Sequence, residues 1–200
     1  MKTPHILRPR RPRSRFHPLV STAALLLPEI EGRPVTVRFQ RALIVHRGKL
    51  YSRRSGGEPV HAGTDIARRV IVLEQDLTTQ PTELARILIH EVFHFAWVRL
   101  GNPLRNAYSD MLRDEFRRGA RGELGWSAEY RKLDLARACS RDAVSDHPKW
   151  RDYVCESFCD TAAWRYSRLT GHDEFTLSSR YRKARERWFA ESFGNTPVAI

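Results

Sequence analysis

Hydrophobic and polar positions follow two different patterns along this chain. Segments 35–40 (VTVRFQ), 41–46 (RALIVH), 49–53 (KLYSR) and 68–75 (RRVIVLEQ) are short and rich in β-branched residues, which predicts strands. The stretch from His46 to Lys49 contains a glycine and predicts a hairpin turn between the second and third segments. Segment 55–63 is rich in glycine and contains a proline, so it is predicted to be a loop.

From Thr79 onward the pattern is that of helices. Thr79 can cap a helix, Pro81 suits its first turn and Gly101 can end it, which predicts a helix over 82–100. Further helices are predicted over 104–118, 127–141, 148–169 and 178–193, and a short apolar helix over 19–27. Strands followed by helices predict an α+β fold, in which a small mixed or antiparallel sheet precedes a helical region.

Length and composition predict one domain. A chain of 200 residues that is 41% hydrophobic can bury one core, whereas a second independent core would be cramped. We expect a disordered basic arm over 1–17, a single domain over 18–195 and a C-terminal tail over 196–200.

The charge of the chain raises the question of an anionic partner. The formal net charge is +12, and the N-terminal segment RPRRPRSR is either a nucleic-acid-binding arm or a solubilising tail. The C-terminal segment RYRKARERWF either tracks phosphates or forms a solvated amphipathic helix. This segment interleaves aromatic residues with basic ones: Tyr181, Trp188 and Phe189 with Arg182, Lys183, Arg185 and Arg187.

The cysteines favour a reducing, cytoplasmic environment. Cys139, Cys155 and Cys159 are odd in number and lack the spacing of a disulfide framework. The apolar run PLVSTAALLLP suggests secretion as an alternative, but no small-residue cleavage site follows and the run is too short to span a bilayer. We therefore expect no membrane partner. Cys155 and Cys159 could supply thiolate ligands at helical spacing, although packing is the favoured interpretation.

The helix predicted over 82–100 is apolar nearly all the way round, which is typical of a buried helix. Its polar residues Glu83, Arg86, His90 and His94 form one stripe, with Glu91 at the edge. Buried ionisable groups cost several kcal/mol unless they are paired or bind a metal. The segment HEVFH fits the His-Glu-x-x-His pattern, in which two histidines one turn apart bind zinc and the glutamate takes a proton from water. The alternative is a pair of hydrogen-bonded core histidines.

This segment resembles the active-site helix of the zincin metallopeptidases. Trp97 and Leu100 stand where the metzincin branch has glycine and histidine, so the resemblance favours the gluzincin branch. That branch takes its third ligand from a later helix, and the segment YVCESFCDTAAW offers Glu156 and Asp160 one turn apart. The resemblance implies Glu156 as the third ligand of one Zn²⁺ ion and Asp160 as the carboxylate that orients a ligand histidine, His90.

Several assignments stay open. Glu115, in LRDEFRR, is an alternative third ligand, although its arginine neighbours favour an exposed, salt-bridged face. Tyr153 is the first candidate for stabilising the developing oxyanion, followed by His147, His172 and Arg121. The strand VIVLEQ could pair with an extended substrate by the same resemblance.

The function predicted from these residues is that of a zinc metallopeptidase, a hydrolase acting on peptide bonds of a protein or peptide substrate. Glu91 serves as general base in this prediction. The alternative is a basic nucleic-acid-binding protein with a structural or catalytically idle zinc site.

Overall fold

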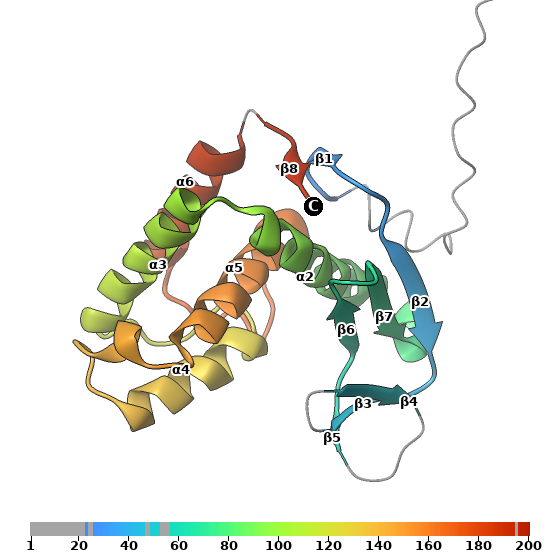
Figure 1. Cartoon of the computed structure of the whole chain (residues 1–200), viewed down its shortest axis with the longest axis horizontal. Helices are drawn as coiled ribbons and strands as arrows, with labels where there is room; N and C mark the ends of the chain where they lie inside the picture. The colour runs from blue at the N-terminus through green and yellow to red at the C-terminus, as the bar shows by residue number, and fades with distance from the viewer. Residues whose placement is uncertain (1–22, 24–25, 47–48, 53–56, 195) are drawn as a thin grey trace, which may run out of the picture.

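The computed structural model describes residues 23, 26–46, 49–52, 57–194 and 196–200 (Figure 1). The predicted basic arm over 1–17 and most of the helix predicted over 19–27 lie outside these residues. The described part is an α+β fold, as the sequence predicts, with helices grouped on one side and small sheets on the other.

A three-stranded mixed sheet supports the site. Strand β7 (Val70–Glu74) lies in the middle, parallel to β2 (Thr36–Gln40) and antiparallel to β6 (Ala62–Asp65). Side chains alternate along β7, so that Ile71 and Leu73 are fully buried while Val70 and Val72 lie on the other face.

A second, antiparallel sheet has the order β4 (Lys49–Ser52), β3 (Leu43–His46) and β5 (Glu58–Pro59). His46 pairs with Lys49, which confirms the predicted hairpin. The predicted loop over 55–63 is wrong at β5 and at the start of β6. Proline is compatible with a strand there because β5 is at the edge of its sheet.

The two ends of the described chain meet in a parallel pair, β1 (Ile30–Glu31) with β8 (Val198–Ala199), at the top of Figure 1. Val198 is buried in the core, so the segment 196–200 is packed against the domain. Strand β8 follows the helices in sequence, so the order is not simply strands first and helices afterwards.

Within the residues that the structure describes, five helices form the other half: α2 (Pro81–Arg99), α3 (Asn102–Arg117), α4 (Trp126–Ala138), α5 (Trp150–Tyr166) and α6 (Ser179–Phe193). Short 3₁₀ turns, η1 (Gln75–Thr79) and η2 (Val144–Asp146), precede α2 and α5. Helix α5 ends earlier than predicted because Arg168 adopts a positive φ of 59°, a conformation that a helix cannot contain.

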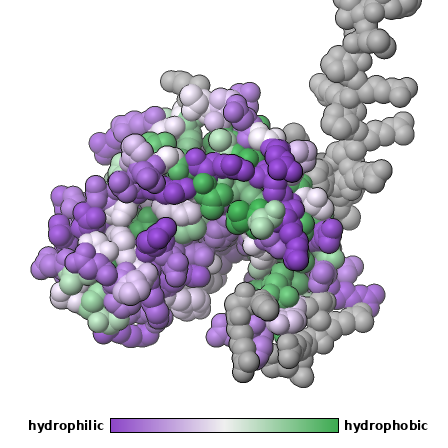
Figure 2. Space-filling view, in the orientation of Figure 1, coloured by the Kyte–Doolittle hydropathy of each residue, from purple (hydrophilic) through white to green (hydrophobic). Residues whose placement is uncertain are grey.

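Helix α2 is apolar all round because it lies between two cores. One face packs on the sheet and contributes Leu84, Leu88 and Phe95 to a cluster with Ile71 and Leu73. The opposite face packs on α5 and enters an aromatic cluster around Phe93, Phe158, Tyr108 and Phe189. Hydrophilic residues cover much of the helical half in Figure 2. The burial of both faces leaves one polar stripe of α2 for the site.

No helix in the described part of the chain combines the length and apolar character needed to cross a membrane.

Candidate metal centre

Helices α2 and α5 bring two histidines and one glutamate together. Nε2 of His90 lies 3.3 Å from Oε2 of Glu156, and Nε2 of His94 lies 4.0 Å from the same oxygen. The two imidazole rings are edge to face, with centroids 4.9 Å apart. The predicted ligands of α2 and α5 therefore converge although they are more than sixty residues apart in sequence.

Asp160 orients His90. Its Oδ1 lies 2.8 Å from Nδ1 of His90, and its Oδ2 accepts a hydrogen bond of 2.9 Å from the backbone N–H of Ala128, in the first turn of α4. Because Nδ1 of His90 is bonded to a carboxylate, Nε2 is the nitrogen left for a metal or a proton.

Gly125 allows this close contact. A Cβ at Gly125 would come within 2.3 Å of Cγ of Asp160, closer than non-bonded carbons can approach. The backbone before α4 can pass over the carboxylate only because residue 125 has no side chain.

The electrostatics favour positive charge at this point. Burial alone would lower the pKa of His90, but the carboxylates of Asp160 and Glu156 outweigh it and raise that pKa well above its ordinary value. Burial would raise the pKa of Glu156, but His90, His94 and Arg131 lower it to about 2. Two imidazoles beside two carboxylates suit a cation between them.

Glu91 is fixed by a contact from the sheet. The hydroxyl of Thr64, on β6, donates a hydrogen bond of 2.6 Å to Oε2 of Glu91. Glu91 is buried, yet it borders the same cavity as His90 and His94.

This cavity has a volume of ≈ 320 Å³ and lies between α2, α4, α5 and β6. Its polar lining consists of Thr64, His90, Glu91, His94, Ser127, Arg131 and Glu156. A larger cavity of ≈ 790 Å³ adjoins it along the sheets, with Val45, Gly63 and Thr64 shared between the two. The histidines therefore open onto a space that can accept an extended ligand.

Arg131 is one of the cavity residues that the sequence interpretation missed. Its guanidinium lies 3.1 Å from Oε1 of Glu156 and donates to the carbonyl of Ser127 at 2.7 Å. About two fifths of its side chain is exposed (40%), so it can also contact a ligand in the cavity. No local pattern indicates this pairing, because it depends on the packing of α4 against α5.

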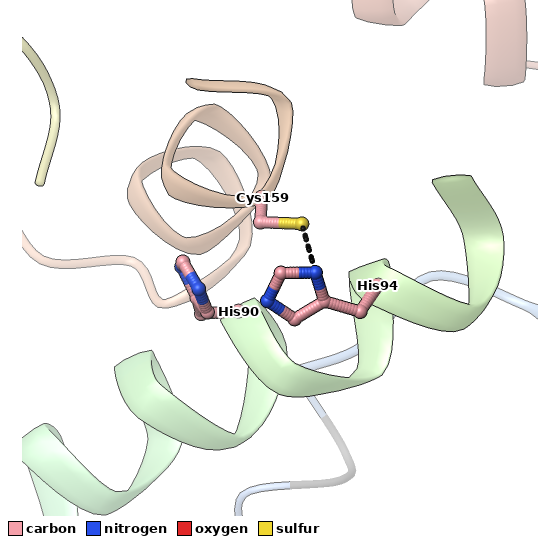
Figure 3. Close-up of side chains that lie close together, drawn as sticks. All are labelled: His90, His94 and Cys159. Atoms are coloured by element: carbon pink, nitrogen blue, oxygen red, sulfur yellow. Dashed lines mark hydrogen bonds between the residues drawn. The ribbon is translucent and has the colours of Figure 1, made fainter. Parts of the chain in front are cut away.

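Two sulfur atoms lie behind His94, on the side of its ring away from Glu156. Sγ of Cys159 is 3.5 Å and Sγ of Cys155 is 3.6 Å from Nδ1 of His94. Figure 3 shows Cys159 of α5 directed at this nitrogen. Ligand atoms of His90, His94 and Cys159 all lie within 4.8 Å of one another, so this buried group could hold a metal ion.

Tyr153 and Glu115 do not reach the cavity. The Tyr153 hydroxyl is fully buried and donates a 2.7 Å hydrogen bond to Glu123, and Glu115 is buried in a 2.6 Å ion pair with Arg185 of α6. The prediction that Glu115 lies on an exposed face is therefore wrong. A fully buried guanidinium needs carboxylate partners, and Arg185 forms ion pairs with both Glu115 and Glu123. Tyr153 as oxyanion stabiliser and Glu115 as alternative ligand are both incompatible with these positions.

The other predicted candidates are also elsewhere. His172 bonds to Glu83 at 2.7 Å, His147 accepts a hydrogen bond from the backbone of Lys149, and Arg121 borders a different cavity. Arg86 bonds to both Glu83 and Glu174, which explains the remaining polar positions of the α2 stripe.

Two further predictions need correction. Strand β7, expected to pair with substrate, is the central strand and is paired on both sides, whereas β6 is an edge strand and lines the cavity. Arg185, expected to face phosphates or solvent, is 0% exposed.

Comparisons with protein-family models, with curated proteins and with solved structures found no match to this chain.

Proposed function

We propose that this protein is a zinc-dependent metallopeptidase of the gluzincin type, with His90, His94 and Glu156 as ligands of one Zn²⁺ ion. The observation that supports it best is that one carboxylate oxygen, Oε2 of Glu156, faces the Nε2 atoms of both histidines at 3.3 and 4.0 Å.

These separations can be compared with those of a zinc site. Ligand atoms at about 2.0–2.2 Å from a tetrahedral ion lie about 3.3–3.6 Å from one another. The separation of 3.3 Å between Nε2 of His90 and Oε2 of Glu156 falls in this range. The separation of 4.0 Å between Nε2 of His94 and the same oxygen is slightly longer, and a small rotation of a side chain would shorten it. The donor set of two imidazoles and one carboxylate is typical of catalytic zinc, and it leaves one position open.

Glu156 is a better third ligand than Cys159 for a catalytic ion. Cys159 is 0% exposed and does not line the cavity, whereas Glu156 does. An ion bound through Nε2 of both histidines faces the cavity, where a substrate can reach it.

Zinc, when bound, polarises a carbonyl and makes a water molecule acidic. Residues of the chain then transfer the proton of this water molecule. Glu91 accepts it and passes it to the leaving amine, while the Thr64 hydroxyl fixes the rotamer of its carboxylate. Arg131, which lines the cavity, would stabilise the negative charge that develops on the carbonyl oxygen. The edge strand β6 offers backbone groups to an extended peptide.

The test combines metal content with hydrolysis of a general protein substrate, casein. Wild type is expected to contain one zinc per chain and to cleave casein. His90→Ala and Glu156→Gln should lose activity, and each should lose zinc when combined with Cys155→Ser, which removes a thiolate that could hold zinc beside His94. Glu91→Gln should keep zinc and lose activity. Glu186→Gln changes an exposed carboxylate that pairs with Arg165 outside the cavity, and it serves as the matched control.

Wild-type protein that binds no zinc would exclude this function. Full zinc in a Glu156→Gln variant that also carries Cys155→Ser would show that the third ligand is another residue, because Cys155→Ser removes a thiolate that could hold zinc beside His94. A Glu91→Gln variant that still cleaves casein would exclude Glu91 as the base.

A further inference from the structure

Cys155 and Cys159 lie one turn apart on α5, and both sulfur atoms approach the same nitrogen of His94. The distances from Nδ1 are 3.6 Å to Cys155 and 3.5 Å to Cys159. Figure 3 shows the contact of Cys159. The other nitrogen of the ring, Nε2, faces Glu156. His94 therefore stands between an oxygen ligand on one side and two sulfur ligands on the other.

These distances match those within a thiolate metal site. Zinc binds sulfur at about 2.3 Å and imidazole nitrogen at about 2.0–2.1 Å, which in tetrahedral geometry puts the sulfur and nitrogen about 3.6 Å apart. The sulfur-to-nitrogen separations in this structure agree with that value at both cysteines.

We propose that Cys155, Cys159 and Nδ1 of His94 form a second metal site, which binds one thiophilic ion such as Zn²⁺ or Cd²⁺. Soft thiolate ligands select such ions over Mg²⁺ or Ca²⁺. On binding, each thiol releases its proton to solvent and His94 contributes the lone pair of Nδ1. Cys155 is only partly buried and gives the ion access, while Cys159 is fully buried.

The site competes with the cavity for His94. A neutral imidazole has one N–H and one lone pair, so an ion on Nδ1 moves the proton to Nε2. That nitrogen then points an N–H group toward Glu156 and can no longer act as a metal ligand. An ion in the thiolate site thus displaces the ion in the cavity. This competition rests on the proposed function, but the thiolate site itself is independent of it.

The experiment is a Cd²⁺ titration of the metal-free, reduced, full-length protein, followed by the ultraviolet absorption that arises when thiolate binds cadmium. We expect one Cd²⁺ per chain to produce this band. Cys155→Ser and Cys159→Ser should each lose most of it. Cys139→Ser is the matched control, because Cys139 is at the end of α4 and its Sγ bonds to the carbonyl of Leu135. That variant should keep the full band.

The role of each histidine separates this site from its neighbours. His94→Ala should weaken the band and His90→Ala should leave it intact. A band that requires His90 and Cys159 but not Cys155 would overturn the proposal and place the ion among His90, His94 and Cys159. Absence of any band in wild type, or its loss in Cys139→Ser, would also overturn it.

Two measurements guard against misfolded variants. Circular dichroism should show unchanged helix content in the serine variants. In wild type, bound Cd²⁺ should protect the partly buried Cys155, but not Cys139, from alkylation. Equal alkylation of these two cysteines in excess Cd²⁺ would contradict the proposal. Glu156→Gln should lose zinc from the cavity but keep the cadmium band, so failure of the peptidase proposal and failure of this one give different results.

Discussion

At the scale of single residues, Asp160 connects the candidate ligands to α4. One oxygen bonds to His90 and the other accepts the N–H of Ala128. Both partners present N–H groups, so both side-chain oxygens of Asp160 must accept a hydrogen bond. A carboxylate has two acceptor oxygens, whereas an amide has only one. The same charge raises the basicity of His90 toward a metal ion.

We therefore predict that Asp160→Asn weakens zinc binding by about 10- to 100-fold. The amide of asparagine turns a donor toward either Nδ1 of His90 or the N–H of Ala128, and one of these contacts is lost. Competition with a zinc-binding dye measures the affinity. Asp152→Asn, on an exposed position of the same helix, is the control and should bind zinc like wild type. Equal affinities in both variants would contradict this role of Asp160.

Gly125 gives a second prediction at this scale. Gly125→Ala introduces a Cβ only 2.3 Å from Cγ of Asp160, so either α4 or the carboxylate must move. We expect a loss of about 1–3 kcal/mol in the free energy of unfolding, measured with urea, together with weaker zinc binding. Gly171→Ala is the matched control because nothing lies within 4 Å of its new Cβ. Similar unfolding curves for the two variants would contradict the prediction.

At the scale of elements, the contact between β6 and α2 joins the edge strand to the proposed base. Thr64→Val keeps the shape of the side chain but removes the hydroxyl that donates to Glu91. A hydrogen bond to a charged group contributes about 1.5–3 kcal/mol, so we expect kcat on casein to fall about 10- to 100-fold with zinc content unchanged. Thr36→Val, at an exposed position of β2, should leave kcat unchanged. Unaltered kcat in Thr64→Val would show that this contact does not orient the base.

The sequence predicts elements whose signal is local. His90, Glu91 and His94 share one turn of α2, and the apolar residues around them are enough to indicate a buried helix. Strand β6, with the sequence AGTD, has no hydrophobic alternation and could not be distinguished from the loop around it. Its strand character comes from pairing with β7, and so the edge of the sheet, and with it Thr64, was missed. Arg131 was missed for a similar reason, since its partner Glu156 is on another helix.

At the scale of the whole molecule, a buried cluster of charged residues connects helices α3, α4 and α6. Arg185 of α6 bonds to Glu115 of α3 and to Glu123, which precedes α4, and Glu123 also pairs with Lys132 at 2.9 Å. Removing one member leaves an unpaired buried charge, which typically costs about 3–5 kcal/mol. Glu115 and Tyr153 thus support the fold that carries Glu156, although neither reaches the cavity.

This cluster predicts how stability depends on pH. Burial would raise the pKa of Glu123, but Arg185 and Lys132 outweigh it and lower the value to about 2. Because the folded-state pKa lies below the ordinary value of 4.5, the stabilisation is complete above about pH 4.5 and is lost as the pH falls toward 2. A shift of this size corresponds to a contribution on the order of 3 kcal/mol.

Urea unfolding between pH 6 and pH 2 measures this contribution. We expect the free energy of unfolding of wild type to decrease steeply below about pH 4.5. Glu123→Gln should be less stable than wild type at pH 6 and should show a shallower decrease toward pH 2, because the variant has no carboxylate to protonate at this position. Glu186→Gln, which removes an exposed carboxylate, should follow the wild-type curve. An equally steep decrease in Glu123→Gln would mean that the acid sensitivity comes from other carboxylates and not from Glu123.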